Sequence, residues 1–254
     1  MQRQAARAGV SWFAVEAQER SVKAGLIRPC SECAVREYSV CAPLDPAEQR
    51  RFTQIMSQVE ATDGTTIFSE TDPADHVFNI TSGAVKVYKL MADGRRAITG
   101  FLFPGDFLGL THRESYAFSA EALSATKLCR FPREKLENLL EEMPALERRL
   151  LGLASNELAA AQDQILLLGR KTAKERLASF LILLSNAASR HGRPANPVDL
   201  PMSRSDIADY LGLTIETVSR TFTQLKREGI VQLLDGNRVR LVKIDRLEAL
   251  AGVA

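Results

Sequence analysis

The chain has 254 residues, 45% hydrophobic and 25% charged, with a formal net charge of +2. This composition is typical of one or two globular domains and argues against extended disorder. No run approaches the roughly 20 apolar residues of a membrane-spanning helix, and the first 28 residues lack a signal-peptide core. We therefore expect a cytoplasmic protein with no membrane partner, in which closely spaced cysteines bind metal or undergo redox chemistry.

Three of the four cysteines lie close together near the N-terminus. Cys30, Cys33 and Cys41 are separated by two and seven residues, whereas Cys129 lies in a distant β-like run. Thiolates in such a set can hold tetrahedral zinc or an iron–sulfur cluster, each with a fourth ligand. The spacing favours a cluster only slightly, because zinc ribbons usually use two close pairs. Cys129 alone is equally well explained as a small buried core residue.

The stretch from residue 46 to 131 changes from a helical to an alternating pattern. Residues 46–58 predict a short amphipathic helix with Phe52, Ile55 and Met56 on one face. Turn residues then separate short β-like runs, which predicts an all-β roll or barrel. These runs cover residues 65–68, 76–80, 83–88, 97–101 and 127–131.

Apolar residues then recur at every third or fourth position from Pro144 to Arg170, which predicts one long helix. Because this helix connects two domains, we expect its apolar stripe to form a homodimer seam; packing within its own domain is the alternative. A second helix should cover residues 173–189. The predicted seam positions are Leu150, Leu158, Ala161, Ile165 and Leu168.

Residues 203–225 predict a helix-turn-helix. Ser203 and Thr214 are suited to cap its two helices, and Gly212 to make the turn. In the second helix the apolar residues at 218, 222 and 225 should face inward. The opposite, exposed face then carries Glu216, Ser219, Arg220 and Thr223.

The exposed face of the second helix has the chemistry of a DNA reader. An arginine can donate two hydrogen bonds to guanine, and a glutamate can accept one from cytosine. Residues 170–243 hold 13 Lys and Arg against 7 Asp and Glu, an excess of six positive charges that suits a surface facing phosphates. A hairpin around residues 235–237 predicts a wing that places Arg238 and Arg240 on phosphate.

An enzyme is not expected. The chain has no P-loop, His-Glu-x-x-His or nucleophile-elbow motif, and its three histidines are scattered. A cytosolic zinc-binding structural protein is a further alternative, which the DNA reader weakens.

Taken together, these features resemble the FNR branch of the CRP/FNR transcription regulators over most of the chain. The cysteine spacing is similar to that of the ANR, FnrN and FnrL type. The resemblance is carried by the four cysteines, the turns at 99–101 and 104–106, and the segments 164–168, 175–178 and 211–220.

The resemblance and the patterns above predict an α+β fold in four parts. Residues 1–29 form an N-terminal extension, and residues 30–142 the cysteine loop with a β-roll sensor domain of the cyclic-nucleotide-binding type. Residues 143–171 form the dimerisation helix. Residues 172–254 form a winged helix-turn-helix.

The resemblance also implies the function. Cys30, Cys33, Cys41 and Cys129 fall where the family holds a [4Fe-4S] cluster, which maintains a DNA-binding dimer without oxygen and which oxygen converts or destroys. The protein would mainly activate anaerobic genes. The implied target is similar to the palindrome TTGAT-N4-ATCAA, read by Glu216, Ser219 and Arg220, and the resemblance implies an RNA polymerase contact at Asp93, Gly94 and Arg95.

Two departures from relatives qualify this assignment. Residues 114–118 replace the Arg-Ser/Thr-Ala element that holds the phosphate in cyclic-nucleotide-binding relatives, so we expect no cyclic nucleotide. Ala161 stands where some members have an acidic residue, so we expect the apo-protein to retain a substantial dimer fraction. The alternative is a regulator of the same fold that senses haem-bound gas through His76 or His112, or thiol redox through Cys30 and Cys33.

Overall fold

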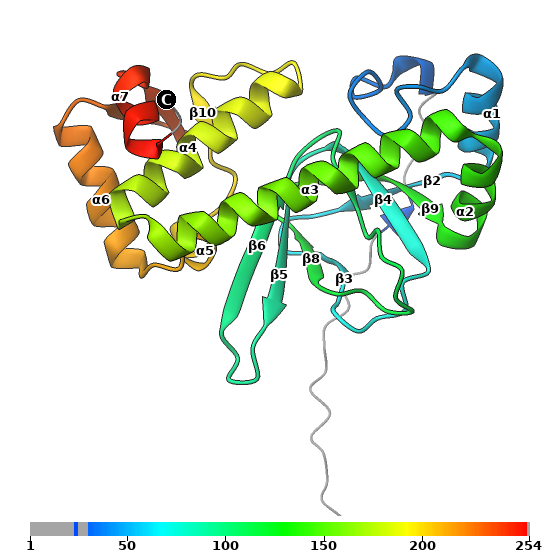
Figure 1. Ribbon diagram of the computed structural model, residues 1–254, viewed down its shortest axis with the longest axis horizontal. Coiled ribbons are helices and arrows are strands. Elements are labelled where there is room, and N and C mark those ends of the chain that lie inside the picture. Colours follow the sequence, from blue (N-terminus) through cyan, green and yellow to red (C-terminus); the bar gives the residue numbers. More distant parts are fainter. Residues whose placement is uncertain (1–22, 25–29, 253–254) are drawn as a thin grey trace, which may run out of the picture.

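The computed structural model describes residues 23–24 and 30–252. Figure 1 shows a β-rich N-terminal half and a mainly helical C-terminal half, joined by one long helix. The predicted α+β fold is confirmed. The predicted N-terminal extension, residues 1–29, lies outside the described residues except for a two-residue strand.

The N-terminal half is a β-roll with helices on one side. Its elements in chain order are β1 (Lys23–Ala24), the 3-10 turn η1 (Cys30–Glu32), α1 (Pro46–Gln54), β2 (Ser57–Ala61), β3 (Thr66–Phe68), β4 (His76–Ser82), β5 (Val85–Leu90), β6 (Arg96–Leu102), β7 (Phe107–Leu108), β8 (Ser119–Ala122), β9 (Thr126–Pro132) and α2 (Arg133–Glu142).

Two antiparallel sheets form the roll. One has the order β1-β2-β9-β4-β7 and the other the order β3-β8-β5-β6. Alternate residues of the facing strands, such as Ile80 and Leu128 in one sheet and Val85 and Ala120 in the other, are buried between them. The opposite face of the five-stranded sheet carries a second core, which α1, α2 and the start of the long helix cover.

The first helix ends earlier than predicted, and several elements of this half were not predicted. Helix α1 ends at Gln54 rather than at residue 58, because the chain turns at Ile55 and enters β2 at Ser57. Met56 is buried beyond the helix, not on its face. Strands β2, β7 and β8 and helix α2 were missed, since strands of two to five residues and a charged ten-residue helix give weak periodicity.

The long helix α3 (Pro144–Arg170) confirms the predicted span. Its first turns belong to the N-terminal core through Leu146 and Leu150, and its last turns to the C-terminal core through Leu167. The prediction that Leu150 faces a second subunit was wrong: its side chain is 5% exposed within a single chain. Large apolar side chains that remain exposed on α3 are Leu151, Leu158, Ile165, Leu166 and Leu168.

The C-terminal half is a winged helix-turn-helix. Its elements are α4 (Ala173–Arg190), β10 (Val198–Asp199), α5 (Arg204–Leu211), α6 (Ile215–Arg227), β11 (Val231–Leu234), β12 (Arg238–Leu241) and α7 (Ile244–Ala251). Strands β10, β12 and β11 form a small antiparallel sheet. Within the described ranges, no helix has the length and apolarity that a membrane crossing requires.

The two halves share a packed boundary. Phe101 of β6 lies 5.2 Å from the ring of Tyr210 and 5.9 Å from that of Phe180. Beside these rings, Lys86 of β5 is buried and ion-pairs with Asp206 of α5 at 3.2 Å. The β-roll therefore contacts the first helix of the DNA reader directly.

Candidate functional site

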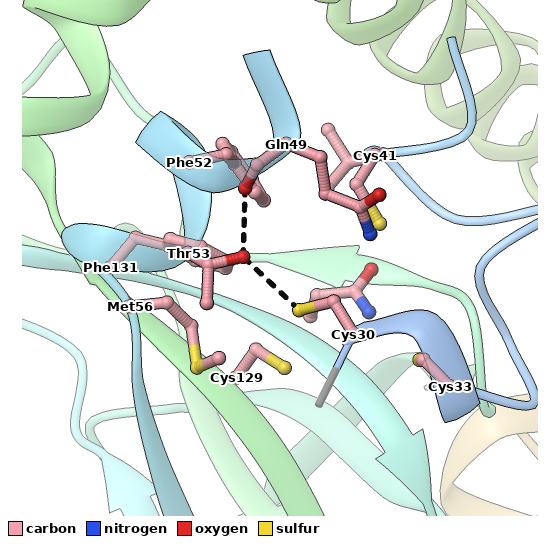
Figure 2. Close-up of a pocket in the computed structure, with 11 residues that line it drawn as sticks. Cys30, Cys33, Cys41, Gln49, Phe52, Thr53, Met56, Cys129 and Phe131 are labelled. Carbon is pink, nitrogen blue, oxygen red and sulfur yellow. Dashed lines mark hydrogen bonds between the residues drawn. The ribbon is translucent and has the colours of Figure 1, made fainter. Parts of the chain in front are cut away.

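The four cysteines line one cavity, although they come from separate parts of the chain (Figure 2). Cys30 begins the 3-10 turn, Cys33 follows that turn, and Cys41 lies at the end of the same loop. Cys129 comes from the middle of β9, on the sheet face that α1 covers. The remaining wall is made by Val40, Gln49, Phe52, Thr53, Met56, Asn79 and Phe131.

Two of the three N-terminal cysteines are in contact with hydroxyl groups. The hydroxyl of Thr53 lies 3.3 Å from Cys30 Sγ, and that of Ser39 lies 3.0 Å from Cys41 Sγ. Burial raises the pKa of the Cys41 thiol, and it raises that of Cys129 to about 12. All four cysteines are free thiols, and ligation of a metal would require them to lose their protons.

The donor set fits a group larger than a single metal ion. Zinc–sulfur bonds of about 2.3 Å place the sulfurs of a zinc site roughly 4 Å apart. Among the described residues, no three His, Cys, Asp or Glu side chains are close enough together to hold one ion. An iron–sulfur cluster instead takes each thiolate on a different iron, so it suits four thiols spread around one cavity.

Two buried polar atoms at this cavity have no hydrogen-bond partner within the part of the chain that the structure describes. They are Nε2 of Gln49, on α1, and Oδ1 of Asn79, which pairs across the sheet with Cys129. An unsatisfied buried amide costs about 1–3 kcal/mol, and native proteins contain few. A polar or charged group bound in the cavity would satisfy them.

The cysteine loop also contacts α3 and the end of α4. Arg149 of α3 donates hydrogen bonds to the carbonyl oxygens of Tyr38, at 2.5 Å, and Ser39, at 3.2 Å. The ring of Tyr38 stacks on His191 at 5.2 Å. Gly105 allows this approach, because a Cβ there would lie 2.5 Å from the Tyr38 ring. These contacts were not predicted from the sequence, because no sequence motif indicates them.

The second candidate site is the outward face of α6. Ser203 and Asp206 form a capping box at the start of α5, Gly212 ends that helix at φ 60°, and the Thr214 hydroxyl accepts a hydrogen bond from the backbone of Thr217. The predicted caps and turn are therefore confirmed. The inward face is buried at Val218, Phe222 and Leu225, and the exposed face carries Glu216, Ser219, Arg220 and Thr223, as the sequence predicts.

The surface of α6 extends beyond the four predicted positions. Gln224 and Arg227 line a shallow hollow together with Ser219, Arg220 and Thr223. Arg227 is a further exposed cation on this face, and sequence reasoning omitted it although the seven-residue spacing from Arg220 places both on one face. Arg238 and Arg240 are exposed on the hairpin that follows.

The remaining predicted residues lie elsewhere. Asp93, Gly94 and Arg95 form the exposed tip of the β5–β6 hairpin, where Arg95 pairs with Asp93 at 2.7 Å. His76 begins β4, and burial lowers its pKa; His112 is exposed in a loop. Neither histidine lines the cysteine cavity.

Comparison with known proteins agrees with this architecture. A model of the cyclic nucleotide-binding domain matches residues 58–143, and a model of the Crp-like helix-turn-helix domain matches residues 175–250. The nitrogen fixation regulation protein FixK of Bradyrhizobium diazoefficiens is 45% identical over 222 residues, covering 87% of this chain and 93% of that protein. The transcriptional activator protein FnrL of Cereibacter sphaeroides is 36% identical over 231 residues, covering 89% and 93%.

A solved structure supports the same assignment. FixK2 from Bradyrhizobium japonicum is 38% identical and superposes with a TM-score of 0.74, covering 79% of this chain and 99% of that one. The names of the two sequence relatives are those of a regulation protein and a transcriptional activator. The chain belongs to the CRP/FNR family and is a DNA-binding transcription activator of the FNR and FixK type, not an enzyme.

Proposed function

We propose that this regulator senses oxygen through a [4Fe-4S] cluster held by Cys30, Cys33, Cys41 and Cys129. The observation that carries the proposal is the convergence of all four cysteines on one cavity, although Cys129 is 88 residues beyond Cys41 in the chain. The unpaired polar atoms at the cavity and the absence of a single-ion geometry among the described residues support a multinuclear group.

The four cysteines would supply one thiolate to each iron, and the bound cluster would supply reactivity toward oxygen. The chain's own residues then couple the cavity to the DNA reader. Ligation would tie the loop at residues 30–41 to β9, and Arg149 connects the backbone of that loop to α3. Disorder of the loop would free Arg149 and uncover the core around Leu146.

The exposed stripe of α3 supports a homodimer. Its members Leu158, Ile165 and Leu166 are between 60% and 70% exposed in the single chain, so a second copy would bury them. Ala161 lies on the same stretch and adds no charge. We therefore propose Leu158, Ala161, Ile165 and Leu168 as the seam, without Leu150, and expect the apo-protein to keep a dimer fraction at micromolar concentration in a sedimentation experiment.

Two symmetry-related readers would contact a palindromic site with half-sites about one helical turn apart. Glu216, Ser219 and Arg220 suit the G·C pairs of a TTGAT-N4-ATCAA-like sequence, while Arg238 suits phosphate. The exposed tip at Asp93, Gly94 and Arg95 is our proposed contact for RNA polymerase, because its internal ion pair presents it as a defined surface.

We do not propose a cyclic nucleotide as the signal. Tyr116, in the segment that replaces the phosphate-binding element, is buried, stacks on Phe68 at 3.8 Å and donates a hydrogen bond to the carbonyl oxygen of His76 at 2.6 Å. Aromatic side chains thus fill the interior of the roll. The second candidate signal is thiol redox, which the four free and partly exposed cysteines favour; haem has no support from the placement of His76 and His112.

The decisive experiment measures iron, acid-labile sulfide and the visible spectrum of protein purified without oxygen. An air pulse then follows, with DNA binding recorded on the same sample. We expect about four iron and four sulfide per subunit, lost together with DNA affinity. Protein that binds the palindrome without iron, and loses binding on formation of a reducible disulfide, would replace the cluster by thiol redox. A Soret band would replace it by haem.

A further inference from the structure

One side of the cysteine cavity is polar although most of its wall is apolar. Val40, Phe52, Met56 and Phe131 line the cavity together with only three side chains that carry hydrogen-bonding oxygen or nitrogen atoms, Gln49, Thr53 and Asn79. Two of these come from α1, four residues apart, a spacing that places both on one face of the helix. Figure 2 shows both directed toward the cavity.

The Thr53 and Gln49 side chains differ in their hydrogen bonding. The single hydroxyl proton of Thr53 has two acceptors within reach, the carbonyl oxygen of Gln49 at 2.8 Å and Cys30 Sγ at 3.3 Å. Gln49 Nε2 is buried and has no hydrogen-bond partner among residues 23–24 and 30–252. An amide nitrogen offers two donors, so a group that accepts hydrogen bonds is the chemistry that the cavity lacks at this point.

A ligated cysteine provides such an acceptor, because its sulfur carries negative charge and the neutral thiol does not. We propose that Gln49 is the hydrogen-bond donor to the sulfurs of the cluster site, assisted by Thr53 at Cys30, and that this donor sets the reduction potential and the lifetime of the cluster in air. This inference rests on the proposed function. Hydrogen bonds to the sulfurs stabilise their negative charge and thereby make loss of an electron harder.

The test replaces Gln49 by leucine, which has similar volume and no donor, and compares it with Gln54→Leu. Gln54 lies on the same helix and is exposed, so the control makes the same chemical change away from the cavity. A third variant, Gln49→His, restores an N–H donor. The reduction potential of the cluster and the decay of its visible absorbance in air are measured for all four proteins after anaerobic preparation.

We expect Gln49→Leu to lower the potential and to shorten the lifetime in air by roughly tenfold, the scale on which partners of metal ligands act. Gln54→Leu should match the parent, and Gln49→His should recover most of the loss. Equal potentials and lifetimes in the parent and Gln49→Leu would overturn the inference while leaving the cluster intact.

Two other outcomes are also decisive. Failure of Gln49→Leu to assemble a cluster, with normal assembly of Gln49→His, supports a donor role; failure of both variants points to packing and overturns it. A parent protein without iron overturns the proposed function and this inference together, whereas a parent with iron confines any failure to Gln49.

Discussion

The helix-turn-helix and the cysteine cavity differ in how completely their polar groups are hydrogen-bonded. Helices α4, α5 and α6 each begin with a side-chain cap, from Thr172, Ser203 and Thr214. Among the described residues, the buried side-chain atoms without a hydrogen-bond partner lie outside α5 and α6: two are at the cysteine cavity, and two are in His191 and Arg193, which follow α4. Helices α5 and α6 therefore carry no such atom among the described residues, whereas the cavity has two.

The two regions meet where the cysteine loop touches the end of α4. Tyr38 stacks on His191, whose Nε2 lies 3.5 Å from Asp106 Oδ1. The unpaired atoms of His191 and Arg193 are at this junction. Side chains thus connect the loop to the DNA-binding half at this junction, in addition to the contact of the loop with α3.

The largest expected effect comes from removing the ligand farthest along the chain. Cys129→Ala should abolish iron binding and anaerobic activation, because it removes the one of the four proposed ligands that the sheet supplies to the cavity. The reader should keep its fold, since Cys129 is absent from its core. Iron content, a reporter assay without oxygen and circular dichroism check these points. Oxygen-responsive activation in this variant would refute the cluster assignment.

The converse change should damage the reader and leave the cavity intact. Phe222 is 2% exposed in the core of the helix-turn-helix, so Phe222→Ala should cost about 3–5 kcal/mol in the free energy of unfolding of the C-terminal half. Denaturant unfolding measures the loss, and anaerobic iron content should stay at the parent level. Thr223→Ala, on the exposed face of the same helix, is the stability control. Loss of iron in Phe222→Ala would show that the two regions fold as one unit.

A smaller effect separates recognition from stability. Arg220 is exposed and its side chain makes only a 3.4 Å hydrogen bond to the carbonyl oxygen of Glu216, so Arg220→Ala should leave unfolding unchanged. It should reduce discrimination at one G·C pair by roughly 1–3 kcal/mol, because an alanine cannot bond guanine. Binding to the palindrome and to single-base variants measures this, with Arg240→Ala as a phosphate-contact control. An unchanged base preference would remove Arg220 from the reading set.

The comparison also shows which parts of the molecule the sequence could predict. Caps, turn and inward face of the reader follow local rules of spacing, so Ser203, Gly212, Thr214 and Val218 were placed correctly. The cavity depends on contacts between distant segments. That Cys129 lies beside the N-terminal loop was predicted only from the family resemblance. The roles of Arg149 and Gln49 could not be predicted from the sequence, because they arise only when α1, α3 and the sheet are packed together.

Leu150 shows the same limit from the other side. It belongs to the same apolar stripe of α3 as Leu158 and Ile165. It is nevertheless buried in the N-terminal core, whereas they are exposed. Periodicity identifies the apolar face of a helix but not the partner that covers it. Only the position at which the β-roll stops covering α3 decides between an internal contact and a seam.

The smallest expected effect concerns pH at the junction of the two regions. Burial raises the pKa of Asp106 to about 6, and burial with the nearby Arg193 and Arg190 lowers that of His191 to about 4. Asp106 therefore stabilises the fold at low pH and loses this contribution as pH rises from about 4 to 6. His191 does the opposite: the unfolded chain binds its proton more readily, so stability is lost as pH falls from about 6.5 to 4.

The two slopes oppose each other in the same window, so the parent protein should show little pH dependence there from this pair. Single variants separate them. His191→Gln should become less stable as pH rises from 4 to 6, by about 1 kcal/mol, because 31% of the Asp106 side chain is exposed and water screens the effect. Asp106→Asn should become more stable over the same range, because only the titration of His191 then remains. Denaturant midpoints measured at half-unit pH steps test both signs. If the stability of both variants changed with pH in the same direction, burial of Asp106 and His191 at this junction, where Tyr38 packs on His191, would not explain the pH dependence.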